Sequence, residues 1–270
     1  CRRRPLRGVA SAAGSVFGSV LATNMLSVQL GDRAVLNGVS IQVAAGEFVL
    51  LAGRNGAGKS TLLRCLIGAL EPNMGIVKLN DKPIVNWLPR DRAREVAFVP
   101  QDTDVPFDFT GRELVTMGRH PHRGRAEALR SQDTNAVNRA LELLDATTFA
   151  DRPVTTLSGG EQRRVAVARS LATEAKILLL DEPTNNLDLE HAHQLVNLLR
   201  KLADEGHGVL VASHDLNLFA AHSDRVVLVH EGRALVDAPP EEALSAQHVK
   251  TVFGVESRTP TTFFPREFTL

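Results

Sequence analysis

The chain has 270 residues, of which 43% are hydrophobic, enough for the core of one or two folded domains. Its 31 basic and 31 acidic residues balance, which argues against broad nucleic-acid binding, because such proteins usually carry excess positive charge. Two cysteines, Cys1 and Cys65, form neither a disulfide framework nor a zinc pattern. No apolar run reaches the roughly 18 residues of a membrane span.

Residues 1–24 differ in composition from the rest of the chain. They begin at Cys1 and carry Arg2, Arg3, Arg4 and Arg7 before a stretch of Ala, Ser, Gly and Val. This composition resembles a weak targeting segment. We favour an upstream extension of unclear status, and we expect the fold to begin at Met25.

The next segments predict a hairpin, a buried strand and a helix. Residues 25–30 and 35–43 alternate apolar and polar side chains around Gly31 and Asp32, which is typical of a hairpin. The apolar run Phe48–Ala52 indicates a buried parallel strand. A helix is expected over residues 60–70, and further strands over residues 76–79 and Val96–Val99.

A glycine-rich loop with the sequence GRNGAGKS joins the buried strand to that helix. Glycines let successive backbone N–H groups close on phosphate oxygens, and the helix N-terminus favours negative charge. Lys59 supplies a positive charge for the β- and γ-phosphates, and the Ser60 hydroxyl can bind Mg²⁺. The residues expected to bind ATP are Gly53, Arg54, Asn55, Gly56, Ala57, Gly58, Lys59, Ser60 and Thr61.

The remaining chain predicts a helical insertion within an α/β fold. Val137, Ala140, Leu141 and Leu144 share one helical face, so residues 102–160 are expected to form a helical subdomain. Alternation of strands and helices then resumes, which favours a mostly parallel sheet. Strands are expected at Ile177–Asp181, 209–213, Arg225–His230 and 233–236, and helices at 161–173, 190–204 and 240–246.

Polar side chains follow several of these strands. Asp181 and Glu182 emerge where a buried strand ends, the edge at which α/β sheets bind ligands. Asp181 can hold Mg²⁺ through water, and Glu182 can polarise an attacking water. His214 and Gln101 follow two other strands and can reach the same edge.

A second helix start has the features of a phosphate cradle. Residues 157–162 read LSGGEQ, so Ser158 can cap the helix and Gly159 and Gly160 permit close approach. One nucleotide does not need two phosphate-binding helix starts. We therefore expect this one to serve a nucleotide held by another subunit.

These motifs together resemble the nucleotide-binding subunits of ABC transporters. The matching segments are residues 53–60 (Walker A), Gln101 (Q-loop), 157–162 (signature), 177–182 (Walker B), 185–188 (D-loop) and His214 (switch histidine). The resemblance implies a P-loop NTPase (RecA-like) core with an N-terminal antiparallel β subdomain. The ABC ATPase domain would span residues 25–240, with 241–270 as a C-terminal tail.

The resemblance also implies a mechanism. Two subunits form a head-to-tail homodimer around two ATP molecules and Mg²⁺. Glu182 acts as general base, with Lys59, His214 and Gln101 as further catalytic residues. The expected metal ligands are Ser60, Gln101 and Asp181, and the residues that contact ATP in trans are Ser158, Gly159, Gly160, Glu161 and Asp188.

A narrower resemblance links the chain to importers of iron-siderophores, haem and vitamin B12. It rests on residues 117–122 (MGRHPH), which follow residues 106–110, and on residues 239–244 and 252–255 of the tail. It implies integral membrane permease subunits, an indirect substrate-binding protein, and a peripheral position on the cytoplasmic face of the inner membrane. Another cargo, a non-transport ABC ATPase and a non-catalytic binding module remain the alternatives.

The sequence departs from the family pattern at the base. Members of the family often carry an aromatic ring near the end of the first strand, but Leu30 occupies the matching position and the chain has no tyrosine. Either apolar contact from Leu30 and Val35 substitutes for the ring, or Arg33 lies over the base.

Overall fold

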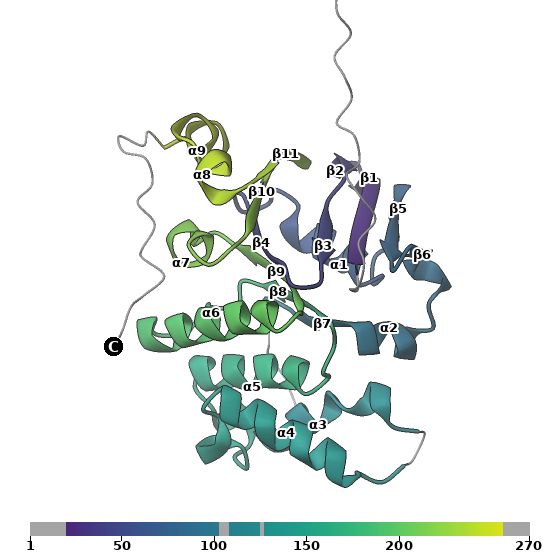
Figure 1. Ribbon diagram of the computed structural model, residues 1–270, viewed down its shortest axis with the longest axis vertical. Helices are drawn as coiled ribbons and strands as arrows, with labels where there is room; N and C mark the ends of the chain where they lie inside the picture. Colours follow the sequence, from purple (N-terminus) through teal and green to yellow (C-terminus); the bar gives the residue numbers. More distant parts are fainter. Residues whose placement is uncertain (1–19, 103–107, 125–126, 256–270) are drawn as a thin grey trace, which may run out of the picture.

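The computed structural model describes residues 20–102, 108–124 and 127–255. Within these residues the chain forms two sheets, with helices below the larger one (Figure 1). The segment 106–110, used above for the narrower resemblance, is described only from residue 108. The ends of the chain, residues 1–19 and 256–270, lie outside the described part.

The larger sheet carries the parallel strands. Its order is β11-β10-β4-β9-β8-β7, with all neighbours parallel except the antiparallel β10–β11 hairpin. The strands are β4 (Phe48–Ala52), β7 (Val96–Val99), β8 (Ile177–Asp181), β9 (Gly208–Ser213), β10 (Arg225–His230) and β11 (Arg233–Ala238). The mostly parallel α/β core expected from the sequence is confirmed.

The smaller sheet is antiparallel and has the order β2-β1-β5-β6, with β3 also paired to β1. Its strands are β1 (Val20–Leu30), β2 (Arg33–Val39), β3 (Gln42–Ala44), β5 (Met74–Leu79) and β6 (Lys82–Pro83). The boundary expected after residue 24 is wrong, because β1 begins at Val20. Leu21 is fully buried and pairs with Val43 and Leu79, so the first residues of β1 belong to the core.

The helices cover the larger sheet and form the insertion. They are α1 (Lys59–Leu66), α2 (Pro89–Glu95), α3 (Gly111–Met117), α4 (Ser131–Leu143), α5 (Gly159–Leu171), α6 (Leu189–Asp204), α7 (Leu216–Ala220), α8 (Pro240–Ala243) and α9 (Ala246–Phe253). The helix expected over 60–70 ends early, because the backbone turns at Gly68 with φ of +65°. The tail contains α9, which the sequence did not predict, and its Val252 is buried.

The parallel strands are buried on both faces, as their continuous apolar runs predicted. Phe48 and Leu50 face the core shared with helices α3 to α6, whereas Val49 and Leu51 face the core shared with α1 and the antiparallel sheet. Alternate side chains of one strand therefore anchor two different layers. This arrangement fixes the ends of the strands, where the polar side chains of the site lie.

The helical insertion is formed by α3 and α4 packed on α5 (Figure 1). Its buried Arg119, 3% exposed, donates to Asp133 at 3.0 Å and to Glu174 and the Ala172 carbonyl at 2.7 and 2.8 Å. His122 lies 2.7 Å from the Thr173 carbonyl. The segment 117–122 thus joins the insertion to the end of α5.

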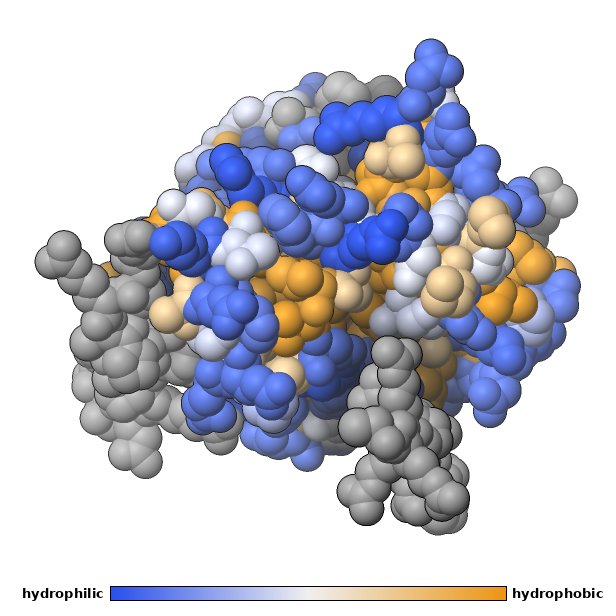
Figure 2. All heavy atoms as spheres, turned by 90° about the horizontal axis from the view of Figure 1, so that it is seen from above, coloured by the Kyte–Doolittle hydropathy of each residue, from blue (hydrophilic) through white to orange (hydrophobic). Residues whose placement is uncertain are grey.

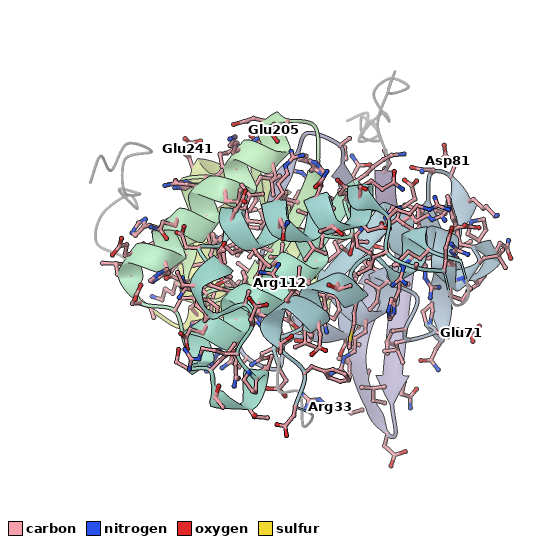
Figure 3. The ribbon with its side chains drawn as sticks, turned by 90° about the horizontal axis from the view of Figure 1, so that it is seen from below. Arg33, Glu71, Asp81, Arg112, Glu205 and Glu241 are labelled. Carbon is pink, nitrogen blue, oxygen red and sulfur yellow. The ribbon has the colours of Figure 1, made fainter. Side chains whose placement is uncertain are left out.

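Charged side chains are spread over the outside of the molecule. The acids Glu71, Asp81, Glu205 and Glu241 lie around its rim when it is viewed from below (Figure 3). From above, hydrophilic residues separate the apolar patches of the described surface (Figure 2). This distribution fits the balanced composition of the chain.

Candidate nucleotide-binding site

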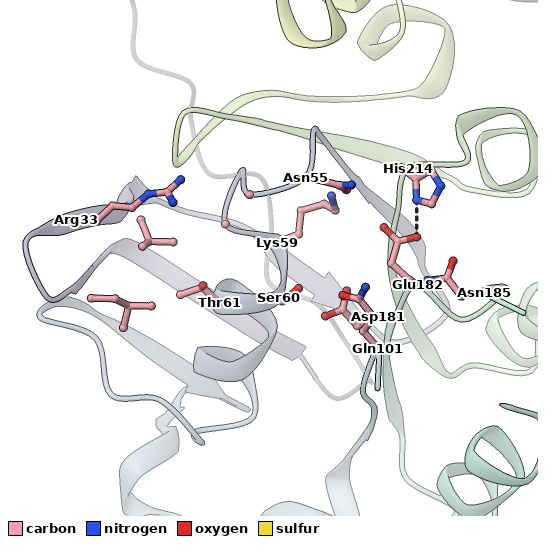
Figure 4. Close-up of a pocket in the computed structure, with 14 residues that line it drawn as sticks. Arg33, Asn55, Lys59, Ser60, Thr61, Gln101, Asp181, Glu182, Asn185 and His214 are labelled. Atoms are coloured by element: carbon pink, nitrogen blue, oxygen red, sulfur yellow. Dashed lines mark hydrogen bonds and ion pairs between the residues drawn. The ribbon is translucent and has the colours of Figure 1, made fainter. Parts of the chain in front are cut away.

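A cavity of about 580 Å³ opens where the parallel strands end (Figure 4). It brings together residues from the glycine-rich loop, from the antiparallel subdomain and from the ends of β7, β8 and β9. Its lining consists of Leu30, Arg33, Val35, Asn55, Gly56, Gly58, Lys59, Ser60, Thr61, Gln101, Asp181, Glu182, Asn185 and His214. Gly53, Arg54 and Ala57 belong to the same loop but are not among the lining residues.

The glycine-rich loop is shaped by close packing under the antiparallel subdomain. Gly58 is the N-cap of α1 and has a φ of +106°, a conformation that L side chains rarely adopt. A Cβ atom there would lie 2.7 Å from Leu36 Cδ2 and 3.0 Å from the Val35 carbonyl. Glycine is therefore required at this position for the loop to keep its shape.

Lys59 is held inside the loop that it is expected to share with phosphates. Its ammonium group donates to the Gly53 carbonyl at 2.8 Å, and its side chain is only 6% exposed. Burial lowers the pKa of Lys59, and the negative charges of Glu182 and Asp181 oppose that shift. A triphosphate would provide stronger partners for this desolvated cation than the loop carbonyls do.

The surroundings of Asp181 fit a divalent cation. Asp181 is 3% exposed, and its Oδ1 is buried without a hydrogen-bond partner in the part of the chain described. Burial raises the pKa of Asp181; the Ser60 hydroxyl opposes this shift with a hydrogen bond, and the Glu182 charge adds to it. A hydroxyl, a carboxylate and the Gln101 amide are oxygen ligands that Mg²⁺ accepts together with waters and phosphates.

Glu182 directly follows β8, has a strained backbone conformation, and contacts the side chains of His214 and Ser213. Its φ is +47°, which is unusual for a residue with a side chain and is typical of functional sites. His214 Nδ1 lies 2.8 Å from Glu182 Oε2, and the Ser213 hydroxyl donates to the same oxygen at 3.3 Å. An ionised carboxylate only accepts hydrogen bonds, so His214 would donate through Nδ1 to the ionised form of Glu182.

The expected trans residues line a second, separate cavity of about 430 Å³. Ser158 and Glu161 form a capping box at the start of α5, with Glu161 Oε2 accepting from the Ser158 N–H at 2.8 Å. A Cβ atom on Gly160 would lie 3.0 Å from the Asn186 carbonyl. The lining consists of Ser158, Gly159, Gly160, Glu161, Arg164, Asn186, Leu187, Asp188 and His191.

The residues expected to contact ATP within one subunit therefore lie together. The residues expected to contact the ATP of a second subunit lie apart from them. Gln101, Asp181, Glu182 and His214 converge on the loop that contains Lys59. No residue of the second cavity lines the first one within the described chain. The glycines of the second cradle are explained by contact with Asn186, a packing reason that the sequence did not show.

Sequence reasoning missed two further side chains near these cavities. His191 lies in the second cavity, where its Nδ1 is 2.7 Å from Asp188 Oδ1. Arg163 is buried on α5 and contacts the backbone of Asp181 and Glu182. The signal for Arg163 was its spacing, because Ala166, Val167 and Ser170 follow it on the buried face of the helix.

Comparison with protein families finds a match between residues 36–185 and the ABC transporter family. The chain is 43% identical over 235 residues to a hemin import ATP-binding protein of Rhodococcus jostii, which covers 87% of this chain and 80% of the relative. It is 37% identical over 248 residues to an achromobactin transport ATP-binding protein of Dickeya dadantii, covering 91% and 92%. A cobalamin import ATP-binding protein of Halobacterium salinarum is 41% identical, covering 84% of this chain and 57% of the relative.

Solved structures share the fold. A metal-chelate type ABC transporter in an inward-facing conformation superposes with a TM-score of 0.77 at 26% identity, covering 91% of this chain and 95% of that one. The ABC transporter component cbiO1 of Clostridium perfringens gives a TM-score of 0.74 at 28% identity, covering 87% and 94%. In the described residues we find no helix long and apolar enough to cross a membrane. The family match, the relatives and the arrangement of the motifs agree, and the chain belongs to the ABC transporter family of ATP-binding proteins.

Proposed function

We propose that the chain is the ATP-hydrolysing subunit of an ABC importer that takes up haem, an iron-siderophore or a cobalamin-type compound. The observation that carries the ATPase assignment is the cavity in which Lys59, Ser60, Asp181, Glu182 and His214 converge. The relatives named for hemin, achromobactin and cobalamin transport support the choice of cargo.

The site supports hydrolysis by in-line attack of water on the γ-phosphate. Glu182 accepts the proton of the water, and His214 holds the Glu182 carboxylate and can reach the phosphate. Lys59 stabilises the charge that develops on the phosphate oxygens. Ser60, Gln101 and Asp181 would hold Mg²⁺, which neutralises phosphate charge when bound.

The second cavity supports a homodimer in which each ATP is shared. Ser158, Gly159, Gly160, Glu161 and Asp188 form an exposed cradle at a helix start, apart from the Lys59 cavity. In a head-to-tail dimer this cradle would face the nucleotide bound by the other copy. Closure around ATP and reopening after hydrolysis would then drive the transport cycle.

The other parts of the transporter are separate proteins in this proposal. Permease subunits would contact the ATPase, and a substrate-binding protein would act through them. The chain would lie as a peripheral subunit on the cytoplasmic face of the inner membrane. A different transported cargo remains the strongest rival; the transport proteins among the relatives speak against a non-transport ATPase.

The base end of the cavity is lined by Leu30, Arg33 and Val35. Arg33 lies at the opposite end from His214, with Lys59 between them (Figure 4). A Cβ atom on Gly56 would lie 3.8 Å from Arg33 Nη2, so the guanidinium lies beside the edge of the glycine-rich loop. We infer that Arg33 covers the base while Leu30 and Val35 give apolar contact.

Glu182→Gln tests the ATPase assignment. The amide cannot take the proton of the attacking water, so turnover should fall by about 100-fold or more while ATP still binds. Steady-state phosphate release measures turnover, and size-exclusion chromatography with ATP should show a trapped dimer. Lys59→Ala is the control that loses ATP binding itself. Parental turnover by Glu182→Gln would sink the general-base assignment.

Arg33→Ala tests how the base is held. If Arg33 covers the base, ATP affinity should fall by about twofold to fivefold, since an exposed cation–π contact is weak. Affinity for inorganic tripolyphosphate should stay unchanged, and Arg33→Phe should restore ATP binding by stacking. Equal weakening of ATP and tripolyphosphate would instead assign Arg33 to the phosphates.

Reconstitution tests the cargo. The ATPase, assembled with its permease in vesicles, should hydrolyse ATP several times faster when a binding protein loaded with haem, ferric siderophore or cobalamin is added. Glu182→Gln in the same vesicles provides the background rate. Stimulation by a chemically unrelated cargo, with none from these three classes, would contradict the proposed substrate class.

A further inference from the structure

Arg163 is a buried cation that lies between the two cavities. It belongs to α5, five residues after the Ser158 cap, and its side chain is only 1% exposed. It lines neither cavity among the residues described. A charged side chain in such a position needs a specific set of partners, because burial of an unpaired charge is costly.

Every N–H group of the Arg163 guanidinium has a backbone carbonyl partner. A guanidinium has five N–H groups, and five carbonyl oxygens accept from it, so the set is complete. The distances are 3.0 Å from Nε to Pro183, 2.6 and 3.1 Å from Nη1 to Pro100 and Gln101, and 2.6 and 2.5 Å from Nη2 to Asp181 and Glu182.

These carbonyls belong to the segments that carry the catalytic side chains. Two follow β7 and include Gln101, and three follow or end β8 and include Asp181 and Glu182. Arg163 is thus the common partner of the loop after β7 and the loop after β8. Lengthening these hydrogen bonds would move the backbone that positions Gln101 on one loop and Glu182 on the other.

The positive charge of Arg163 lies close to the carboxylates of Asp181 and Glu182. Burial lowers its pKa to about 10, while the charges of Asp181 and Glu182 oppose the shift. The guanidinium therefore stays protonated at neutral pH. Its hydrogen-bond partners among the described residues are backbone carbonyls, so the carbonyl dipoles and the two nearby acids balance its charge.

Arg163 also lies close in sequence to the exposed start of α5, which lines the second cavity. Ser158 caps the helix, and Gly159 and Gly160 pack against Asn186 on the loop after β8. The first turns of α5 therefore form the Ser158 cradle and, through Arg163, contact the backbone of Asp181 and Glu182. Helices transmit small displacements as rigid elements, so a movement of the cradle reaches Arg163 directly.

We propose that Arg163 is a positioning residue that couples the two half-sites of one subunit. When the nucleotide of a second subunit engages the start of α5, Arg163 adjusts the backbone of Gln101 and Glu182 in its own site. The proposal rests on the head-to-tail dimer of the proposed function. It assigns Arg163 no contact with ATP.

Arg163→Lys and Arg163→Gln test the proposal on the full chain. Lysine keeps the charge but loses the planar fork that reaches both loops, so it should not rescue activity. Both variants should lower kcat by about 10- to 100-fold, as expected when a catalytic group is displaced by about 1 Å. KM for ATP should change little, and the cooperativity of hydrolysis with ATP should decrease.

The matched control is Arg119→Lys, which also alters a buried arginine with several partners but lies in the helical insertion. It should lower the Tm and leave kcat per folded molecule at the parental value. If the Arg163 variants behave in the same way, Arg163 only stabilises the fold and the proposal is overturned.

Hydrogen exchange on the Glu182→Gln chain gives a readout that needs no Arg163 variant. Compared with ATP bound to the same chain carrying Ser158→Arg, which should not close the dimer, formation of the ATP-bound dimer should slow amide exchange at residues 101–102, 182 and 184–187 as well as at the start of α5. Protection confined to the cradle would contradict the coupling. Failure of this inference is distinguishable from failure of the proposed function, because Glu182→Gln would still abolish turnover in the first case.

Discussion

Parallel pairing of the buried strands is the constraint on which the site depends. Val99 of β7 pairs with Leu180 of β8, and Asp181 pairs with Ala212 of β9. Ala52 of β4 pairs with Ser213. Because these strands end in register, the residues that follow them, among them the glycine-rich loop, Gln101, Glu182 and His214, emerge at one edge. A one-residue slip would move the side chains of that strand into the opposite core and separate these groups.

The same sheet explains why one chain would hold only half of the complete site in the proposed dimer. The polar strand ends form the Lys59 cavity, whereas the cradle at Ser158 lies at the start of a helix that belongs to the inserted layer. Neither cavity is complete alone if the nucleotide needs contacts from two sides. Between them lies the buried cation Arg163, which has five carbonyl partners from both catalytic loops. In the proposed dimer, hydrolysis takes place in the Lys59 cavity, and the Ser158 cradle contacts the nucleotide of the second subunit.

Much of this arrangement could be predicted from the sequence, and the reasons are physical. β4, β7, β8 and β10 match their predicted bounds, since strands buried on both faces are continuous apolar runs with clear ends. The glycine-rich loop and the acids were recognisable because phosphate chemistry restricts the residue types. The beginning of β1 at Val20 was missed because the composition of the preceding residues suggested an extension. The helical spacing of Arg163 indicated a buried position, but its role could not be predicted, because its partners are backbone carbonyls that leave no trace in the sequence.

The central claim to test is that, in the proposed dimer, the Lys59 cavity of one copy faces the Ser158 cradle of the other. Chains carrying Asn55→Cys and chains carrying Ser158→Cys, both with Cys1→Ser and Glu182→Gln, would be mixed and treated with a short bifunctional thiol reagent. Asn55 and Ser158 are exposed, and Cys65 is buried. We predict a covalent dimer that joins the two kinds of chain and forms only when ATP and Mg²⁺ are present. An ATP-dependent dimer in which Asn55→Cys and Ser158→Cys are never joined would contradict the account.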